Sequence, residues 1–152
     1  MTLRIIAIGK KHESWVAEGI ARYESRLTKP WNISWILIPH SQQHGEDARR
    51  DESGKILSRL SPDDFVILLD ERGTIYDSPQ ISSRIASLID TSRHVVFVIG
   101  GAYGVSEEVR TRANDIWSLS HLVFPHQLVR LILIEQLYRS WSIHHGRAYH
   151  NE

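Results

Sequence analysis

The chain has 152 residues, with 18 Lys plus Arg, 18 Asp plus Glu and no Cys. This length is sufficient to bury a hydrophobic core and predicts a single domain over residues 1–152, whereas the lack of Cys excludes disulfides, a zinc ribbon and a thiol nucleophile. A net charge of zero, with His neutral, excludes the basic surplus of non-specific nucleic-acid binders. RNA would therefore have to be bound through a local patch, a second subunit or a target of defined shape. No apolar run of about 18 residues and no signal-peptide pattern occurs, so we expect a soluble, cytoplasmic protein with no membrane partner.

Apolar runs that are typical of strands alternate along the chain with helical patterns. The predicted strands cover residues 3–9, 33–39, 64–70, 94–100 and 116–124. These runs are nearly continuous in Val, Ile and Leu, which indicates strands that are buried on both faces. The sequence therefore predicts an α/β fold with a mainly parallel sheet between two layers of helices.

The helices between these strands are predicted from periodicity and from start signals. The first is indicated by apolar residues that recur on one helix face, namely Val16, Ile20, Tyr23 and Leu27. We expect a loop and then a helix in the charged stretch 42–55 and the residues that follow it. Ser78 is expected to cap the next helix, with Pro79 at its first position. Ser106 begins a short helix, and Pro125 begins the last one, which ends near residue 145.

Three strand ends have unusual sequences, and ligands of such sheets bind beyond the carboxyl ends of the strands. They are "LLDERG" (68–73), "IGGAYG" (99–104) and "SLSHLVFPH" (118–126). Gly100 and Gly101 fit either a backbone that a ligand approaches closely or a tight turn. They do not form a G-x-G-x-x-G motif, which disfavours a Rossmann dinucleotide site. The third run fits either a loop that lines a pocket or a buried edge strand.

The last helix and the closing residues suggest an interface and a site. The helix is apolar on every side, which favours packing on a partner subunit. Its Glu135 and Arg139 fit either a surface ion pair or an interface pocket. His126 fits either a proton-transferring group or a capping residue. The other histidines near the end lack carboxylates at ligand spacing, so we expect no metal site. The terminal "GRAYHNE" (146–152) would by itself read as a frayed end.

The runs "VFVIGGAYG", "SLSHLVFPHQLVR", "LIEQLYRSWSI" and the final "AYH" resemble the RlmH family of ribosomal RNA methyltransferases, in the SPOUT superfamily. The resemblance spans the chain and implies a C-terminal trefoil knot and a homodimer. It also implies S-adenosylmethionine as the cofactor. By position, the cofactor contacts carry over to Leu69, Gly100, Leu119, Ser120, His121, Leu122, Val123 and Phe124.

The implied reaction is methylation of N3 of a pseudouridine in a stem-loop of 23S ribosomal RNA on the assembled ribosome. N3 carries a proton, so the site needs a proton acceptor or cationic groups, and the base must leave its stack. The candidate catalytic residues are His150, Tyr149, Arg139 and His126, with His150 and Tyr149 first. This makes the closing residues part of the site, folded over the cofactor or across the dimer. The alternatives are a SPOUT methyltransferase acting on transfer RNA, a non-catalytic ribosome-binding factor and a flavodoxin-like nucleotide binder.

Overall fold

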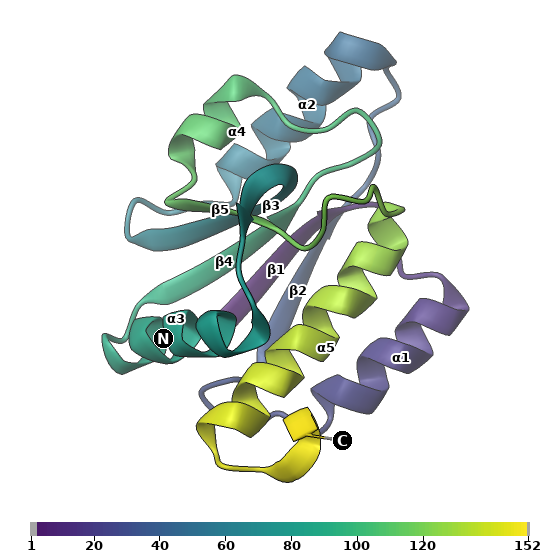
Figure 1. The fold of residues 1–152 in the computed structure, drawn as a ribbon. Coiled ribbons are helices and arrows are strands. Elements are labelled where there is room, and N and C mark those ends of the chain that lie inside the picture. The colour runs from purple at the N-terminus through teal and green to yellow at the C-terminus, as the bar shows by residue number, and fades with distance from the viewer. Residues whose placement is uncertain (1–2, 152) are drawn as a thin grey trace.

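The computed structural model describes residues 3–151, in which strands and helices alternate (Figure 1). The strands are β1 (Leu3–Ile8), β2 (Ile33–Ile38), β3 (Asp64–Ile75), β4 (His94–Ile99) and β5 (Asp115–Ser118). The helices are α1 (Ser14–Glu24), α2 (Gly45–Ser58), α3 (Ser78–Asp90), α4 (Glu107–Arg112) and α5 (His126–His144), followed by the short 3-10 helix η1 (Ala148–Asn151).

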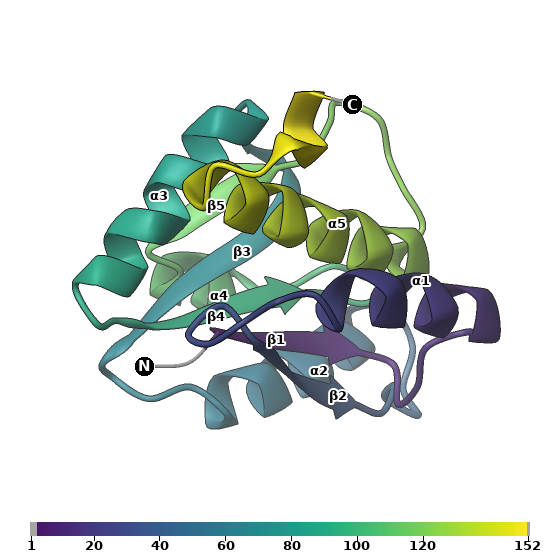
Figure 2. The ribbon, with the colours of Figure 1, turned by 90° about the horizontal axis from the view of Figure 1, so that it is seen from below.

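The five strands form one sheet in the order β2-β1-β4-β3-β5, and every neighbouring pair is parallel. Helices α1, α3 and α5 cover one face, and α2 and α4 cover the other (Figure 2). The predicted α/β class with a parallel, three-layer sheet is confirmed. The trefoil knot stays a prediction.

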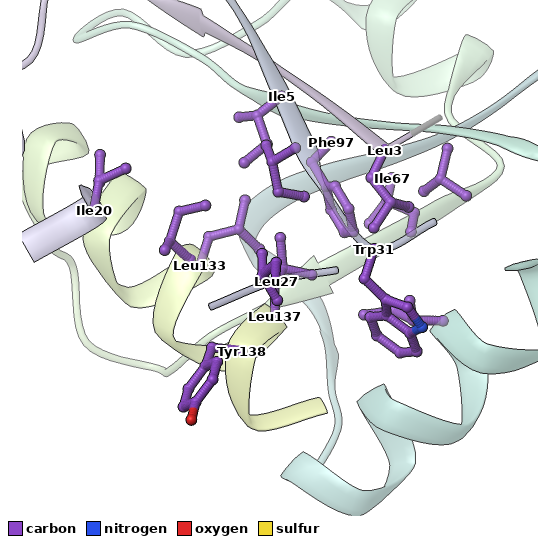
Figure 3. Close-up of a cluster of buried hydrophobic side chains, with 14 of the residues drawn as sticks. Leu3, Ile5, Ile20, Leu27, Trp31, Ile67, Phe97, Leu133, Leu137 and Tyr138 are labelled. Carbon is purple, nitrogen blue, oxygen red and sulfur yellow. The ribbon is translucent and has the colours of Figure 1, made fainter. Parts of the chain in front are cut away.

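Successive side chains of each central strand enter different cores, because neighbouring residues of a strand point to opposite faces. In β1, Ile5 packs in the cluster beneath α1, α3 and α5, while Ile6 packs beneath α2 and α4. Figure 3 shows the first cluster, where Phe97 of β4 lies near Leu133 and Leu137 of α5. Full burial of each such side chain contributes about 1.5–3 kcal/mol. This explains the unbroken Val and Ile content of the strands.

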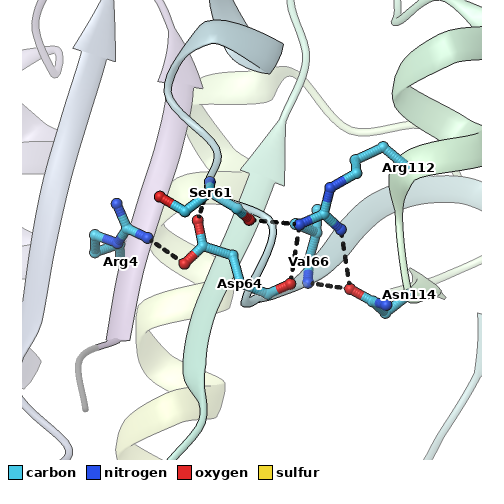
Figure 4. Close-up of polar contacts among 6 residues, drawn as sticks. All are labelled: Arg4, Ser61, Asp64, Val66, Arg112 and Asn114. Carbon is cyan, nitrogen blue, oxygen red and sulfur yellow. Dashed lines mark hydrogen bonds and ion pairs between the residues drawn. The ribbon is translucent and has the colours of Figure 1, made fainter.

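A polar network fixes the amino ends of β1, β3 and β5 (Figure 4). Arg4 donates to the Asp64 carboxylate at 2.8 Å, and Arg112 donates to the carbonyls of Ser61 and Asp64 at 2.8 and 3.0 Å. The Asn114 side chain accepts from the Val66 N–H at 2.8 Å. These bonds anchor the edge strand β5, so that its far end has a fixed position.

The predicted ends of β3 and β5 are wrong by several residues, whereas β1, β2 and β4 each end one residue earlier than predicted. β3 continues to Ile75, because both Leu69 and Thr74 pair with Trp117 and the residues between them form an irregularity. Gly73 permits this close approach, since a Cβ there would lie 2.5 Å from the Ile116 carbonyl oxygen. β5 ends at Ser118, so the rest of the predicted strand 116–124 is loop.

Two helix starts also differ from the prediction. α2 begins at Gly45, so a stretch expected to be loop is helical. Asp77, not Ser78, is the N-cap of α3. Its carboxylate accepts from the Gln80 N–H at 2.8 Å, and the Gln80 side chain accepts from the Asp77 N–H at 2.9 Å. This capping box satisfies two helix N–H groups, which a Ser78 cap would leave open.

Candidate functional site

A cavity of about 560 Å³ lies at the carboxyl ends of β4 and β5, beside the irregularity of β3 that follows Leu69. All three unusual strand ends contribute to its wall. Of the eight predicted cofactor residues, it is lined by Leu69, Gly100, Leu119, Ser120, Leu122, Val123 and Phe124. His121 is not among the lining residues; its side chain is exposed.

The loop after β5 is shaped by two serine side chains. The Ser118 hydroxyl donates to the Ser120 carbonyl at 2.8 Å, and the Ser120 hydroxyl accepts from the Leu122 N–H at 3.0 Å. These bonds turn the chain away from the sheet, so the loop reading of this run is the correct one. Leu122 and Val123 on this loop are 68% and 76% exposed. Apolar side chains with such exposure, beside a cavity, are typical of surfaces that bind a ligand or a partner.

Gly100 and Gly101 begin the tight turn that leads out of β4. The Gly104 N–H donates to the Gly101 carbonyl at 3.0 Å. A Cβ at Gly100 would lie 2.9 Å from Val105 Cγ1, and one at Gly101 would lie 2.8 Å from Glu52 Oε1. Both glycines also line the cavity. The tight turn is therefore present and its backbone lines the cavity, whereas the close approach of a ligand to Gly100 stays a prediction.

The charged part of the wall is centred on Asp70, the residue after Leu69. Its carboxylate accepts from the Arg72 N–H at 2.8 Å and from Arg110. Burial alone would raise the pKa of Asp70, but these donors outweigh it and lower the pKa. The cavity wall therefore carries the negative charge of Asp70 beside the positive charges of Arg72 and Arg110. Asp70 could be expected in the wall because it ends the predicted strand 64–70. Arg110 lies 40 residues further along the chain, and no sequence pattern indicated its contact with Asp70.

His126, the first residue of α5, also lines the cavity. Burial, Arg130 and His40 lower the pKa of its imidazole, against the smaller opposing effect of Glu13 and Glu52. The ring is consequently neutral near pH 7 and able to accept a proton. His40 lies next to it, with ring centroids 5.9 Å apart.

Arg130 lies one turn further along α5 and is fully buried. It donates to the carbonyls of Ile8, Gly9 and Lys11 at 2.9, 3.1 and 3.1 Å. These bonds fix the start of α5, and with it His126, to the carboxyl end of β1. No local feature of the sequence indicated this role.

The other three candidate catalytic residues lie together at the opposite end of α5. Arg139 donates to Glu135 at 2.6 and 3.0 Å and contacts His150 Nδ1 at 3.2 Å. The Tyr149 hydroxyl donates to Glu135 at 3.2 Å. Burial and the neighbouring Tyr23 and Glu135 raise the pKa of Tyr149, so its hydroxyl stays protonated. Arg139, Tyr149 and His150 thus form one polar cluster with Glu135, in which a guanidinium, a phenol hydroxyl, an imidazole and a carboxylate lie together.

This cluster does not lie at the cavity of its own chain. Arg139 follows His126 by 13 residues on one helix, which corresponds to about 20 Å. None of the described residues after Val129 lines the cavity, and Figure 1 shows η1 at the far end of α5 from the loop after β5. The expectation that the tail folds over its own cofactor site is not met, because the tail packs instead on α5 and on Tyr23 of α1.

Two further properties concern the part of the chain that the structure describes. No group of three or more His, Asp or Glu side chains within residues 3–151 is placed to hold a metal ion. No helix in that range is long and apolar enough to cross a membrane.

Known proteins match this chain over nearly its whole length. Residues 1–150 match the family described as predicted SPOUT methyltransferase. Ribosomal RNA large subunit methyltransferase H of Dichelobacter nodosus is 41% identical over 99% of both chains. The protein of the same name from Alkalilimnicola ehrlichii is 37% identical, again over 99% of both. A methylase family protein from Neisseria gonorrhoeae has the same fold, with a TM-score of 0.55 over 90% of this chain and 81% of its own, at 10% identity.

Proposed function

The chain belongs to the SPOUT methyltransferase family, and from this premise we propose that it methylates N3 of a pseudouridine in a stem-loop of 23S ribosomal RNA, on the assembled ribosome, with S-adenosylmethionine as methyl donor. Relatives that match end to end are named as methyltransferases of the large-subunit ribosomal RNA. The observation that carries the proposal is that residues from three separate segments of the chain, all expected to contact the cofactor, line one cavity.

The cavity suits this cofactor in size and in chemistry. Its volume of about 560 Å³ lies within the usual range for small-molecule sites. Leu69, Gly100 and the loop 119–124 would hold the adenosine through apolar side chains and main-chain groups. S-adenosylmethionine carries charges of both signs, and so does the wall around Asp70 and Arg110.

The bound cofactor supplies an already activated methyl group, so the protein has to position the reactants and manage a proton. Correct positioning alone can lower the barrier by about 7–11 kcal/mol. The chain must also remove the proton from N3. His126 at the cavity and His150 in the tail are the two candidate acceptors, Arg139 would stabilise the anionic base, and Tyr149 would donate a hydrogen bond to it or stack on it.

A second copy of the chain would bring these residues to one place. Within one chain, His126 and Arg139 lie about 20 Å apart along α5. We therefore propose a homodimer in which the tail of one copy covers the cavity of the other. Leu128, Leu131 and Ile132 of α5 are only partly buried in the single chain, and Leu122 and Val123 are exposed, which supports such an interface.

The test is transfer of a labelled methyl group from S-adenosylmethionine to ribosomes that lack the modification, with free ribosomal RNA in parallel. We expect label on ribosomes alone, released as N3-methylpseudouridine. No label on either substrate, from folded protein that binds the cofactor, would contradict the proposal. Light scattering in the same buffer checks the dimer.

A further inference from the structure

Four exposed cations gather near the C-terminal end of α5. Arg22 and Arg26 lie at the end of α1, Lys29 follows them, and Arg147 lies between α5 and η1. None of the four forms an ion pair within residues 3–151. We call these four residues the basic end surface. It is a local concentration of unpaired positive charge on a chain whose net charge is zero.

Aromatic rings connect the basic end surface into one platform. Arg22 lies 6.0 Å from the ring of Tyr23, and Arg26 lies 5.6 Å from that of Tyr138. The Tyr23 and Tyr138 ring centroids are 5.8 Å apart, so these two pairs adjoin.

The platform continues through Trp141. Its ring stacks on Tyr138 at 5.8 Å, and Arg147 lies 5.7 Å from it. The Trp141 Nε1–H donates to Thr28 at 3.1 Å, which brings the residue before Lys29 to the same place. Segments 113 residues apart in the sequence thus form one surface.

The geometry leaves the hydrogen-bonding capacity of these arginines unused. None of the three guanidinium groups donates a hydrogen bond to another residue in the described part of the chain, since each lies against a ring. A ring holds a guanidinium by its face and leaves the N–H edge open to a ligand. Arginine in this arrangement is well suited to binding phosphate, because its planar fork fits two oxygens of one phosphate group.

Exposed aromatic surface beside the cations favours a nucleic acid over an acidic protein. His145 stacks on Trp141 with ring centroids 4.6 Å apart, and its side chain is exposed. His144 is exposed next to it, at 5.2 Å. Unpaired bases of RNA stack on such rings while the backbone lies on the cations.

We propose that the basic end surface binds the phosphate backbone of the RNA beside the base to be methylated. This inference rests on the proposed function for the identity of the RNA. The position of the basic end surface supports this inference. The Tyr23 ring, which contacts Arg22, lies 6.4 Å from the ring of Tyr149, one of the candidate catalytic residues. Phosphates held at Arg22, Arg26 and Arg147 would thus lie next to the residues that are to handle the base.

The test is the salt dependence of RNA binding by the triple variant Arg22→Gln, Arg26→Gln, Arg147→Gln. The probe is a fluorescein-labelled RNA hairpin, titrated by anisotropy at several salt concentrations. Each lost phosphate contact lowers the slope of log Kd against log salt by about 1, so a reduction of about 3 is expected. Arg59→Gln is the control, because this exposed arginine follows α2 on the opposite face of the sheet and should leave the slope unchanged.

Methyl transfer to unmodified ribosomes, cofactor binding and light scattering are measured on the same proteins. The expected result is a raised KM for ribosomes, unchanged cofactor affinity and an unchanged dimer. An unaltered slope and KM in the triple variant would overturn the inference. Loss of RNA binding that merely follows dissociation of the dimer would also overturn it, and would assign the surface to contact between subunits. If the parent protein methylates no ribosome but the slope still falls in the triple variant, the surface stands and the proposed function fails.

Discussion

The two ends of α5 differ in whether the arginines near them are bonded to polar partners. At the cavity end, Arg110 is paired with Asp70, and Arg130 donates to three carbonyls. At the tail end, Arg22, Arg26 and Arg147 rest on rings and form no ion pair within the described chain. A neutralised site fits a small ligand of mixed charge, whereas unpaired cations fit a polyanion. One helix therefore separates the proposed cofactor site from the proposed RNA site.

The largest expected effect comes from a substitution that damages the cavity end and the tail end of α5 alike. Arg130→Met should lower the free energy of unfolding by about 3 kcal/mol or more, because each buried acceptor left unpaired costs about 1–3 kcal/mol. Urea unfolding followed by circular dichroism measures the effect. Arg59→Met is the matched control on an exposed arginine and should change little. An Arg130→Met protein as stable as the parent would show that the three carbonyls find other partners.

A change confined to the tail end should leave the cavity end intact. His150→Ala is expected to lower kcat by about 10²–10⁴-fold, the usual contribution of a proton-transferring group. Calorimetric titration with S-adenosylmethionine should give an unchanged affinity. His44→Ala, at the exposed N-cap of α2, serves as the control. Equal loss of transfer and of cofactor binding would show that the tail is structural.

A change confined to the cavity end should give the reverse pattern. Gly100→Val places a side chain where a Cβ already lies 2.9 Å from Val105 Cγ1, so the turn must shift. We expect the affinity for the cofactor to fall about tenfold or more, equivalent to 1.4 kcal/mol, with hairpin RNA binding unchanged. Gly54→Ala, where a Cβ meets nothing within 4 Å, is the control. Unchanged cofactor binding would remove Gly100 from the site.

The smallest expected effect separates the two candidate proton acceptors. The pKa of His126 lies below its usual value of 6.5, because burial, Arg130 and His40 outweigh the carboxylates of Glu13 and Glu52. If His126 accepts the proton, the single-turnover rate of methyl transfer falls on the acid side with a midpoint below pH 6.5. His126→Gln should remove this acid limb. An acid limb that persists in His126→Gln belongs to another group, with His150 the first to test.

The alternation of strands and helices and the three strand ends could be predicted from the sequence, because both depend on local periodicity and composition. The assignment of the loop 119–124 to the cofactor is a prediction that followed from the resemblance of "SLSHLVFPHQLVR" to a known family. The capping box at Asp77 was missed because an adjacent serine and proline gave a competing signal. The contacts of Arg110 with Asp70 and of Arg26 with Tyr138 depend on how the helices pack on the sheet and on one another. Contacts of this kind across the fold leave no periodic trace in the sequence.

The bonds between Arg130 and the carbonyls after β1 have a consequence for the order of events during synthesis. The Ile8 carbonyl belongs to the first strand to be made, and its partner follows 122 residues later. The carboxyl end of β1 therefore remains without that partner until synthesis has passed Arg130. Since Arg130 also anchors the start of α5, an incomplete chain lacks the fixed wall that His126 provides. Assembly of this wall is thereby coupled to synthesis of the segment that contains α5.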